Sequence, residues 1–384
     1  MMSLTAGNKK NACYENFCNK TLSSIKPKTQ KLISLTFKDS LKSALDLLAE
    51  NGIMSAPVVD NRSGKLVGSL GVISLLRYIV SHLPTTQVSP IEMQQLKLNG
   101  KDLGKVSIEQ VYNFKYPLGC PDLTLATNDT VHDLIKLCAT PINQTTLWYP
   151  HRAILIDPAT HNFVGIASQT DVMKWLLSHC TDLNCSCPTR AILKLQLDDP
   201  LLDSMMDKKS PLIKASIHSS VLKILDICFT KNVSYLLLED PLQNNKLVGY
   251  FSARALRGIM VDNFKDFCLD TKAFLEKYSP ASLSPITIQQ DQGTVADVLK
   301  ILVEKKMHHI AVLNSQNEPV DVFSITDLMI VLDAADKSFI GQPIVQQTFS
   351  YLTASDGHYF QVTEDDQTIN IRVKAPERAN RNNM

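Results

Sequence analysis

Two stretches of the chain place a serine and an aspartate three residues apart, where an apolar strand gives way to a helix. One holds Ser168 and Asp171, and the other holds Ser324 and Asp327. A carboxylate in the first turn of a helix can accept hydrogen bonds from both hydroxyls of a ribose, and the free N–H groups there attract anions. Serine and aspartate are also preferred residues for capping a helix. Because the pattern is intact twice, we favour ligand binding by Ser168, Thr170, Asp171, Ser324, Thr326 and Asp327.

A second group of polar residues precedes the middle strand beside each of these junctions. His151-Arg152 stands before the apolar run 153–156, and His308-His309 stands at the matching place before 310–313. Imidazole and guanidinium groups suit a phosphate, and the forked donors of arginine fit it especially well. The alternative is that these side chains are solvated residues between a helix and a strand. Their paired occurrence favours phosphate binding.

These groups recur because the chain repeats one unit four times, and such repetition decides the fold. Each copy runs strand, helix, strand, turn, strand, helix. The last copy shows it most clearly, with a strand at 285–290, a helix at 294–306, and strands at 309–314 and 320–324. The aligned third strands carry Gly68, Gly165 and Gly249, where the fourth copy has Asp321. The irregular spacing predicts four small α/β units joined by variable linkers rather than a tightly stacked solenoid.

Composition shifts give the predicted boundaries. Residues 1–31 are polar and are predicted to be flexible, and residues 337–384 form a tail. The connector at 181–209 carries prolines and an acidic pair, so it is the best boundary between two halves of the chain. Residues 263–281 are predicted to be helical. The repeats cover 32–82, 116–180, 210–262 and 282–336, with linkers at 83–115, 181–209 and 263–281.

The composition is that of an ordinary soluble globular protein. Of its 384 residues, 44% are hydrophobic and 20% are charged, and the net charge of +1 gives no argument for a nucleic-acid or membrane surface. No apolar run approaches the ~20 residues of a membrane helix. The nine cysteines are odd in number and scattered, which is typical of reduced intracellular thiols. We therefore expect the protein in the cytosol or nucleus.

Motifs for other chemistry are weak or missing from the sequence. His179, Cys185 and Cys187 lie close together, but the single residue between the two cysteines is too short for the usual structural zinc site. We expect no metal. The sequence contains no phosphate-binding Gly-x-x-x-x-Gly-Lys loop, no Gly-x-Ser-x-Gly elbow and no His-Glu-x-x-His motif. After four repeats too little chain remains for a catalytic domain, so we expect no enzymatic activity and no catalytic residues.

The repeats resemble CBS (cystathionine-β-synthase-type) domains, each a β-α-β-β-α unit. The resemblance rests on the strand ending in Gly-x-x-Ser-x-x-Asp, the helix before it, and strands such as Ser55-Ala56-Pro57. It implies that consecutive repeats pair into two Bateman modules that form a flat disc. A chain with four such repeats resembles the γ regulatory subunits of the AMP-activated/SNF1-related protein kinases. Residues 55–57, 151–158 and 233–236 carry this second resemblance.

The resemblance to the γ subunits implies a regulatory protein that binds AMP, ADP, ATP or another adenosyl ligand between repeats. It also implies a kinase catalytic subunit and a scaffold subunit as partners. The departures are specific: Ser74 and Ala255 replace the ribose-binding aspartate in repeats 1 and 3, Asp171 is present in the repeat that usually lacks it, and Met54 stands where an arginine is common. The alternative is a structural scaffold whose nucleotide sites have largely decayed.

The tail contains one predicted hairpin outside the repeats. Residues 359–363 and 369–373 alternate apolar and polar side chains around a turn at 364–367. The unpaired edge of such a hairpin can accept a strand from another chain. We predict that it contributes to docking a kinase-complex subunit, and the alternative is that it folds back on its own domain.

Overall fold

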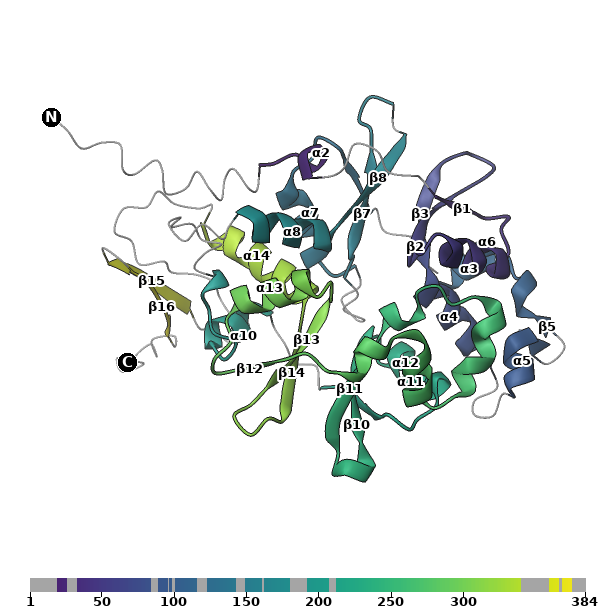
Figure 1. The fold of residues 1–384 in the computed structure, drawn as a ribbon. Coiled ribbons are helices and arrows are strands. Elements are labelled where there is room, and N and C mark those ends of the chain that lie inside the picture. Colours follow the sequence, from purple (N-terminus) through teal and green to yellow (C-terminus); the bar gives the residue numbers. More distant parts are fainter. Residues whose placement is uncertain are drawn as a thin grey trace, which may run out of the picture.

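The computed structural model of the protein describes residues 19–25, 33–83, 89–95, 97–98, 101–115, 123–142, 149–160, 162–179, 192–206, 212–339, 359–365 and 368–374. Four three-stranded sheets dominate this part of the chain (Figure 1). Each sheet belongs to one of the four sequence repeats, so the predicted α/β repeat architecture is confirmed. We number the repeats 1 to 4 in chain order.

Repeats 1 and 2 have the same element order. Repeat 1 consists of β1 (Leu35–Thr36), α3 (Leu41–Glu50), β2 (Ser55–Val59), β3 (Leu66–Gly71) and α4 (Val72–Ser81). Repeat 2 consists of β6 (Thr124–Ala126), α7 (Val131–Ala139), β7 (Arg152–Ile156), β8 (Phe163–Ser168) and α8 (Gln169–His179). In both, the middle strand in sequence is also the middle strand of the sheet.

Repeats 3 and 4 follow the same plan with one difference. Repeat 3 consists of β9 (Lys214–Ser216), α11 (Val221–Thr230), β10 (Tyr235–Asp240), β11 (Lys246–Ser252) and the 3-10 turn η3 (Ala253–Leu256). Repeat 4 consists of β12 (Thr287–Gln289), α13 (Val295–Glu304), β13 (His309–Leu313), β14 (Pro319–Ser324) and α14 (Ile325–Phe339). Repeat 3 therefore lacks the closing α-helix that the sequence predicts in every copy. Arg257 there is extended and Gly258 has a φ of +79°, which ends the helical turn.

The register of the sheets repeats four times. In each, the first strand pairs parallel with the middle strand, and the third pairs antiparallel with it. A shift in register lies next to one residue of the third strand in every repeat. That residue is Gly68, Gly165, Gly249 or Asp321, the position at which the four sequences align.

The first helix of each repeat begins at a capping residue, which explains where the helices start. The side chains of Ser40, Thr130, Ser220 and Thr294 each accept a hydrogen bond from the backbone N–H three residues later. The helices then bury one face, as their apolar spacing predicts. In α3, for example, the buried residues are Leu41, Ala44, Leu45 and Leu48.

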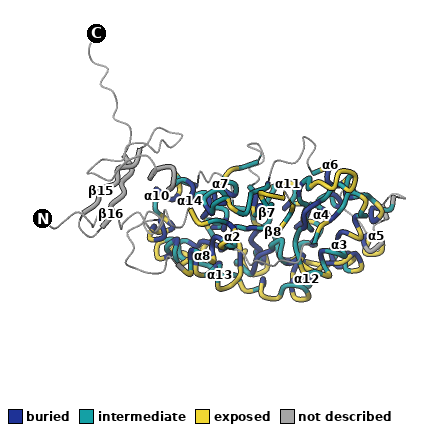
Figure 2. Tube along the Cα trace, turned by 90° about the horizontal axis from the view of Figure 1, so that it is seen from above, coloured by how far each residue is buried: buried dark blue, intermediate teal, exposed yellow. Residues whose placement is uncertain are grey.

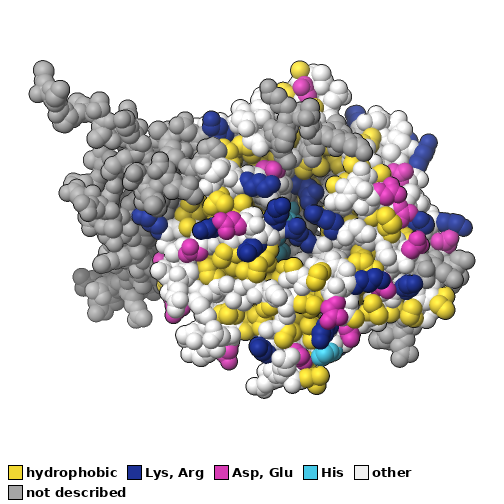
Figure 3. Space-filling model, in the orientation of Figure 1, with side chains coloured by type: hydrophobic (Ala, Val, Ile, Leu, Met, Phe, Trp, Pro, Cys, Tyr) yellow, Lys and Arg dark blue, Asp and Glu magenta, His cyan; other side chains and the backbone are white. Residues whose placement is uncertain are grey.

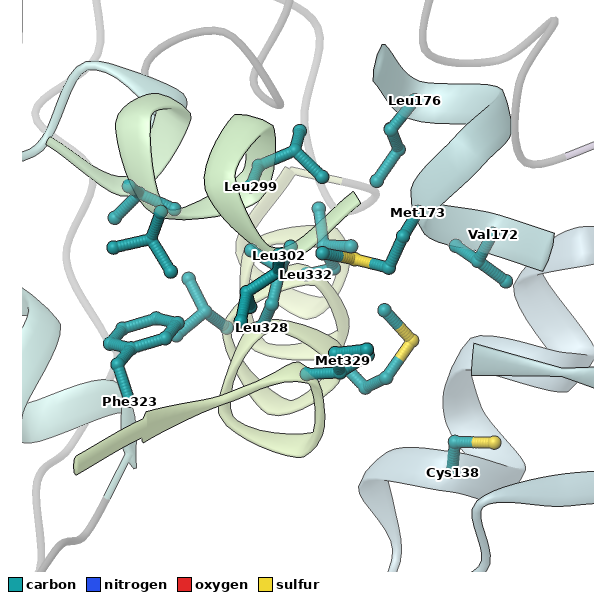
Figure 4. Close-up of a cluster of buried hydrophobic side chains, with 14 of the residues drawn as sticks. Cys138, Val172, Met173, Leu176, Leu299, Leu302, Phe323, Leu328, Met329 and Leu332 are labelled. Carbon is teal, nitrogen blue, oxygen red and sulfur yellow. The ribbon is translucent and has the colours of Figure 1, made fainter. Parts of the chain in front are cut away.

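The helices join the repeats into two hydrophobic cores. One core contains buried residues of α7, α8, α13 and α14 and so unites repeats 2 and 4 (Figure 4). The close-up shows Met173 of α8 facing Leu302 and Leu332, which come from α13 and α14. The second core contains buried residues of α3, α4 and α11 and unites repeats 1 and 3. The sheets of repeats 1 and 2 meet each other, as do those of repeats 3 and 4, so that the four repeats form a ring (Figure 1).

This ring is flat. It is broad when viewed as in Figure 1 and much thinner when turned by 90° (Figure 2). The arrangement agrees with two Bateman modules, repeats 1 and 2 in one and repeats 3 and 4 in the other, packed through their helices into a disc. Within the described residues no helix is long and apolar enough to cross a membrane.

Segments predicted as linkers, and part of the predicted flexible N-terminal segment, are integral to this disc. The backbone N–H at the start of the first helix of each repeat bonds to a carbonyl of such a segment: Leu41 to Val106, Val131 to Lys20, Val221 to Leu269, and Val295 to Leu195. The segments contain α2 (Leu22–Ile25), α5 (Pro90–Gln95), β4 (Lys97–Leu98), β5 (Lys101–Asp102), η1 (Leu103–Lys105), α6 (Ile108–Lys115) and α10 (Pro200–Met206). Between repeats 3 and 4 they contain η4 (Val261–Cys268), α12 (Thr271–Tyr278) and η5 (Pro280–Leu283), as the predicted helicity of 263–281 requires.

The N-terminal segment differs from the expectation of a flexible arm in its described part. Leu22 is fully buried in the core of repeats 2 and 4 because the segment pairs with the start of α7. In the tail, β15 (Tyr359–Asp365) and β16 (Thr368–Lys374) pair antiparallel, so the predicted hairpin is confirmed at the level of the backbone.

Candidate functional site

The Ser-x-x-Asp junctions of repeats 2 and 4 have nearly the same geometry. Asp171 Oδ2 accepts hydrogen bonds from the backbone N–H and the hydroxyl of Ser168, at 2.8 and 2.6 Å. Asp327 Oδ2 accepts the same two bonds from Ser324, at 2.6 and 2.7 Å. The serine and aspartate therefore do form a helix cap. A carboxylate can accept more than two hydrogen bonds, so this cap is compatible with a ligand contact but does not by itself indicate one.

Thr170 and Thr326 stand beside these carboxylates and are half-buried. The corresponding junctions of repeats 1 and 3 lack the carboxylate. Ser74 in α4 is half-buried, and Ala255 in η3 is almost fully buried. Only repeats 2 and 4 thus offer the predicted ribose contact.

The first residue of each middle strand lies at the contact between paired sheets. In repeats 1 and 2 this residue is Ser55 and Arg152, and Arg152 Nη1 donates a hydrogen bond of 2.8 Å to Ser55 Oγ. In repeats 3 and 4 it is Tyr235 and His309, whose rings stack with centroids 4.7 Å apart and an interplanar angle of 18°. The same position is therefore polar in one module and aromatic in the other.

Three of the four residues predicted to bind phosphate interact electrostatically with one another: His151, Arg152 and His308. Enclosure by protein, and then electrostatic interaction with Arg152, His308 and Lys115, lower the pKa of His151 to about 4. Enclosure, followed by Arg254, Arg152 and Arg257, likewise lowers the pKa of His308 to about 4. Both imidazoles are nevertheless exposed to solvent. Side chains that are enclosed and also reached by water line an internal hollow.

Figure 3 shows such a hollow near the middle of one face of the disc, with Lys and Arg side chains around it and His side chains inside. We call His151, Arg152, Arg254, Arg257 and His308 the central cationic group. Among the described residues, none of its three guanidiniums forms an ion pair with a carboxylate. Burial lowers the pKa of Arg152, and the nearby carboxylate of Asp171 acts in the opposite direction and raises it. Cations gathered without a paired anion favour an anionic ligand.

The structure places His309 in a ring stack with Tyr235. It also adds two arginines and a lysine that the sequence did not single out. Arg254 follows Ser252 by two residues, in the junction of repeat 3, so the repeat alignment was a signal that could have found it. Arg257 and Lys115 carry no such signal, because the first follows the shortened helix and the second ends α6 in a predicted linker.

A metal site has no support in the part of the chain that the structure describes. No three His, Cys, Asp or Glu side chains gather there in a way that could hold an ion. Cys185 and Cys187 lie outside the described residues, as does the side chain of His179.

Comparisons with known proteins agree with the repeat architecture. Residues 23–81 and 281–334 match the model of the CBS domain. The γ subunit of 5′-AMP-activated protein kinase from Saccharomyces cerevisiae is 20% identical over 320 residues, which cover 81% of this chain and 89% of that protein.

Two solved structures cover four fifths of the chain. The MJ1225 protein of Methanocaldococcus jannaschii superposes with a TM-score of 0.56 at 12% identity, over 80% of this chain and 98% of that one. A conserved protein of Pyrococcus horikoshii has a TM-score of 0.42 at 14% identity, over 81% and 99% of the two chains. The first of these likenesses supports the fold. The chain therefore contains CBS domains within a fold of four similar repeats, and it resembles the γ regulatory subunit of AMP-activated protein kinase.

Proposed function

We propose that the protein is a non-catalytic regulatory subunit that binds adenine nucleotides between its repeats and regulates a partner protein kinase. The observation that best supports nucleotide binding is the central cationic group. Its three guanidiniums form no ion pair with a carboxylate among the described residues, and Asp171 lies near enough to interact electrostatically with Arg152. An adenine nucleotide offers a ribose to the aspartate and an anionic phosphate to the cations.

Phosphate distinguishes the candidate ligands. AMP, ADP and ATP carry negative charge that the central cationic group can neutralise, whereas adenosine carries none and S-adenosylmethionine bears a cationic sulfonium. Nucleotide phosphates are also recognised by the planar fork of arginine better than by a single ammonium. We therefore place phosphorylated adenosines ahead of other adenosyl ligands.

The proposal of a kinase partner rests on the similarity to the yeast protein and not on the geometry of the candidate nucleotide site. The yeast protein whose sequence is 20% identical is named as a subunit of a protein kinase, and the similarity extends over 89% of its length. A catalytic subunit and a scaffold subunit are the partners that we propose. Regulation then consists of a difference in nucleotide affinity between active and inactive complexes.

Calorimetric titration of the purified chain with AMP, ADP, ATP, adenosine and S-adenosylmethionine tests the ligand. We expect binding of the three nucleotides and weak or no binding of the other two. Tighter binding of S-adenosylmethionine than of AMP would rule out the phosphate assignment. Co-expression with kinase catalytic and scaffold subunits, followed by a kinase assay with and without AMP, tests the regulation.

A scaffold without nucleotide sites is the second candidate. It is favoured by Ser74 and Ala255, which leave two of the four junctions without a carboxylate. Recovery of the kinase subunits by a chain that binds none of the three nucleotides would establish it instead.

A further inference from the structure

One buried amide connects repeats 2 and 4 at their Ser-x-x-Asp junctions. Gln169 is the first residue of α8, between Ser168 and Asp171, and its exposed fraction is 6%. Its backbone N–H donates to the carbonyl of the residue before the middle strand, His151. The same bond identifies the equivalent residues of the other repeats, which are Val72, Ala253 and Ile325. Repeat 2 thus has a buried amide where the other three repeats have an apolar side chain.

The Gln169 amide has partners in both repeats. Its Nε2 donates to the carbonyl oxygen of Pro150 at 3.3 Å and to Thr326 Oγ1 at 3.1 Å. Pro150 immediately precedes His151 and Arg152, which belong to the central cationic group. Thr326 lies between Ser324 and Asp327, in the junction of repeat 4. A single side chain therefore joins the junction of repeat 4 to the backbone that positions the cations of repeat 2.

We propose that Gln169 is a positioning residue that couples the nucleotide clefts of repeats 2 and 4. This inference rests on the proposed function. A ligand that engages the repeat 4 junction acts on Thr326, and a buried amide cannot lose that partner without a free-energy cost. Its other hydrogen bond holds the chain just before His151. Occupancy of either cleft then changes the affinity of the other, and the effect is equal in both directions.

The test is a set of AMP titrations by calorimetry on the full chain. Asp327→Ala weakens the repeat 4 cleft so that the titration reports mainly the repeat 2 cleft, and Asp171→Ala does the reverse. The overall association constant for two AMP molecules on the unmodified protein, divided by the product of the two single-cleft constants, is the coupling factor. We expect this factor to differ from one by about fivefold or more, the usual lower range of allosteric coupling. Gln169→Leu, introduced into all three proteins, is expected to bring it within about twofold of one.

The matched control is a hydrogen bond between the other two repeats. Arg77 Nη2 of α4 donates to Asn232 Oδ1 at 3.0 Å, which joins repeats 1 and 3. Asn232 has a φ of +54°, so Asn232→Gly removes the contact and keeps a conformation that glycine adopts readily. This variant should leave the coupling factor unchanged. Thermal melting of each variant reports any general loss of stability, and Gln169→Met serves in place of Gln169→Leu if the branched side chain prevents folding.

The outcomes separate the inference from the function on which it rests. A coupling factor near one in the unmodified protein, or one that Gln169→Leu leaves unaltered, overturns the role of Gln169 while two nucleotides still bind. A protein that binds no AMP, or whose stoichiometry neither aspartate variant lowers, overturns the two-cleft assignment itself.

Discussion

The guanidinium of Arg152 is held by a neutral partner, the hydroxyl of Ser55 at 2.8 Å on the facing sheet of the same module. A carboxylate in this place would neutralise the cation, whereas a hydroxyl orients it and leaves its charge available. In the other module the equivalent pair is the stacked Tyr235 and His309, which carries no fixed positive charge into the contact. The two modules therefore present different chemistry to a phosphate, and we expect the module of repeats 1 and 2 to depend more strongly on arginine.

Replacement of this arginine should separate phosphate binding from nucleoside binding. We expect Arg152→Gln to weaken AMP about 10- to 150-fold, the loss of a hydrogen bond to a charged group, and to change adenosine binding by less than about twofold. Calorimetric titration measures both. Arg62→Gln is the control, because the Arg62 side chain is 80% exposed and forms an ion pair with Glu109, which is itself exposed. Equal losses for AMP and adenosine would show that Arg152 supports the fold rather than the ligand.

The aspartate of repeat 4 should contribute to nucleotide affinity beyond its role as a cap. We expect Asp327→Ala to weaken AMP about 10- to 150-fold through the lost ribose contact. It should also destabilise the protein by about 1 kcal/mol through the lost cap. The binding loss should be smaller for 2′-deoxy-AMP, which offers one ribose hydroxyl fewer.

Asp297 is the matched control for this variant. Its Oδ2 accepts hydrogen bonds from the backbone N–H and the hydroxyl of Thr294, at 3.0 and 2.6 Å, at the exposed N-terminus of α13. Asp297→Ala should lower the melting temperature comparably and leave AMP affinity intact. If the two variants bind AMP equally well, the carboxylate of Asp327 is only a cap.

His151 and His308 should make nucleotide binding depend on pH. His151 and His308 have pKa values of about 4 in the free protein, against an ordinary value of 6.5, so both are neutral at pH 7. A bound phosphate favours the imidazolium and raises these pKa values. Binding should therefore take up protons, and affinity should rise as the pH falls from about 7 toward 5. Titrations in two buffers of different ionisation enthalpy measure the uptake directly.

A double variant isolates this effect from the titration of the phosphate itself. His151→Asn combined with His308→Asn removes the imidazoles and keeps polar side chains of similar size. The phosphate titrates alike in both experiments, so the difference between the proteins reports the histidines. Identical proton uptake by the two proteins would contradict the assignment.

The same pKa shifts predict how the free protein responds to acid. Between about pH 6.5 and 4 the unfolded chain binds more protons at these histidines than the folded chain does. The free energy of unfolding therefore falls as the pH is lowered through this window. Urea unfolding at several pH values should show a shallower decline for the double variant. A decline of equal slope would show that other groups dominate acid sensitivity.

The sequence predicts the repeats because their signals are local. Apolar spacing, capping residues and the glycine of the third strand recur within each unit, and the structure has the corresponding helices, strands and register shifts. The closing helix of repeat 3 is the exception, since Gly258 ends it after one turn. The apolar face of α8 or α14 shows that a helix packs, but it does not show that repeat 2 packs against repeat 4.

The site was predicted less completely for a similar reason. Ser168, Asp171, Ser324 and Asp327 belong to a motif that can be read along the chain. Arg254 and Arg257 acquire meaning only when the ring of repeats brings them toward His308. His309 looks equivalent to Arg152 by position, but its contact depends on Tyr235, a residue of another repeat.

We predict that the hairpin β15–β16 contributes to docking a subunit of the kinase complex. Its two strands pair with each other, and within the described residues no third strand joins their sheet. An unpaired strand edge can accept a strand of another chain. We expect deletion of residues 357–384 to reduce co-purification of the kinase scaffold or catalytic subunit while AMP affinity stays unchanged, because the central cationic group lies wholly within the repeats. Undiminished recovery of both subunits, at normal thermal stability, would remove the docking role. A lowered melting temperature would instead indicate that the hairpin packs on its own disc.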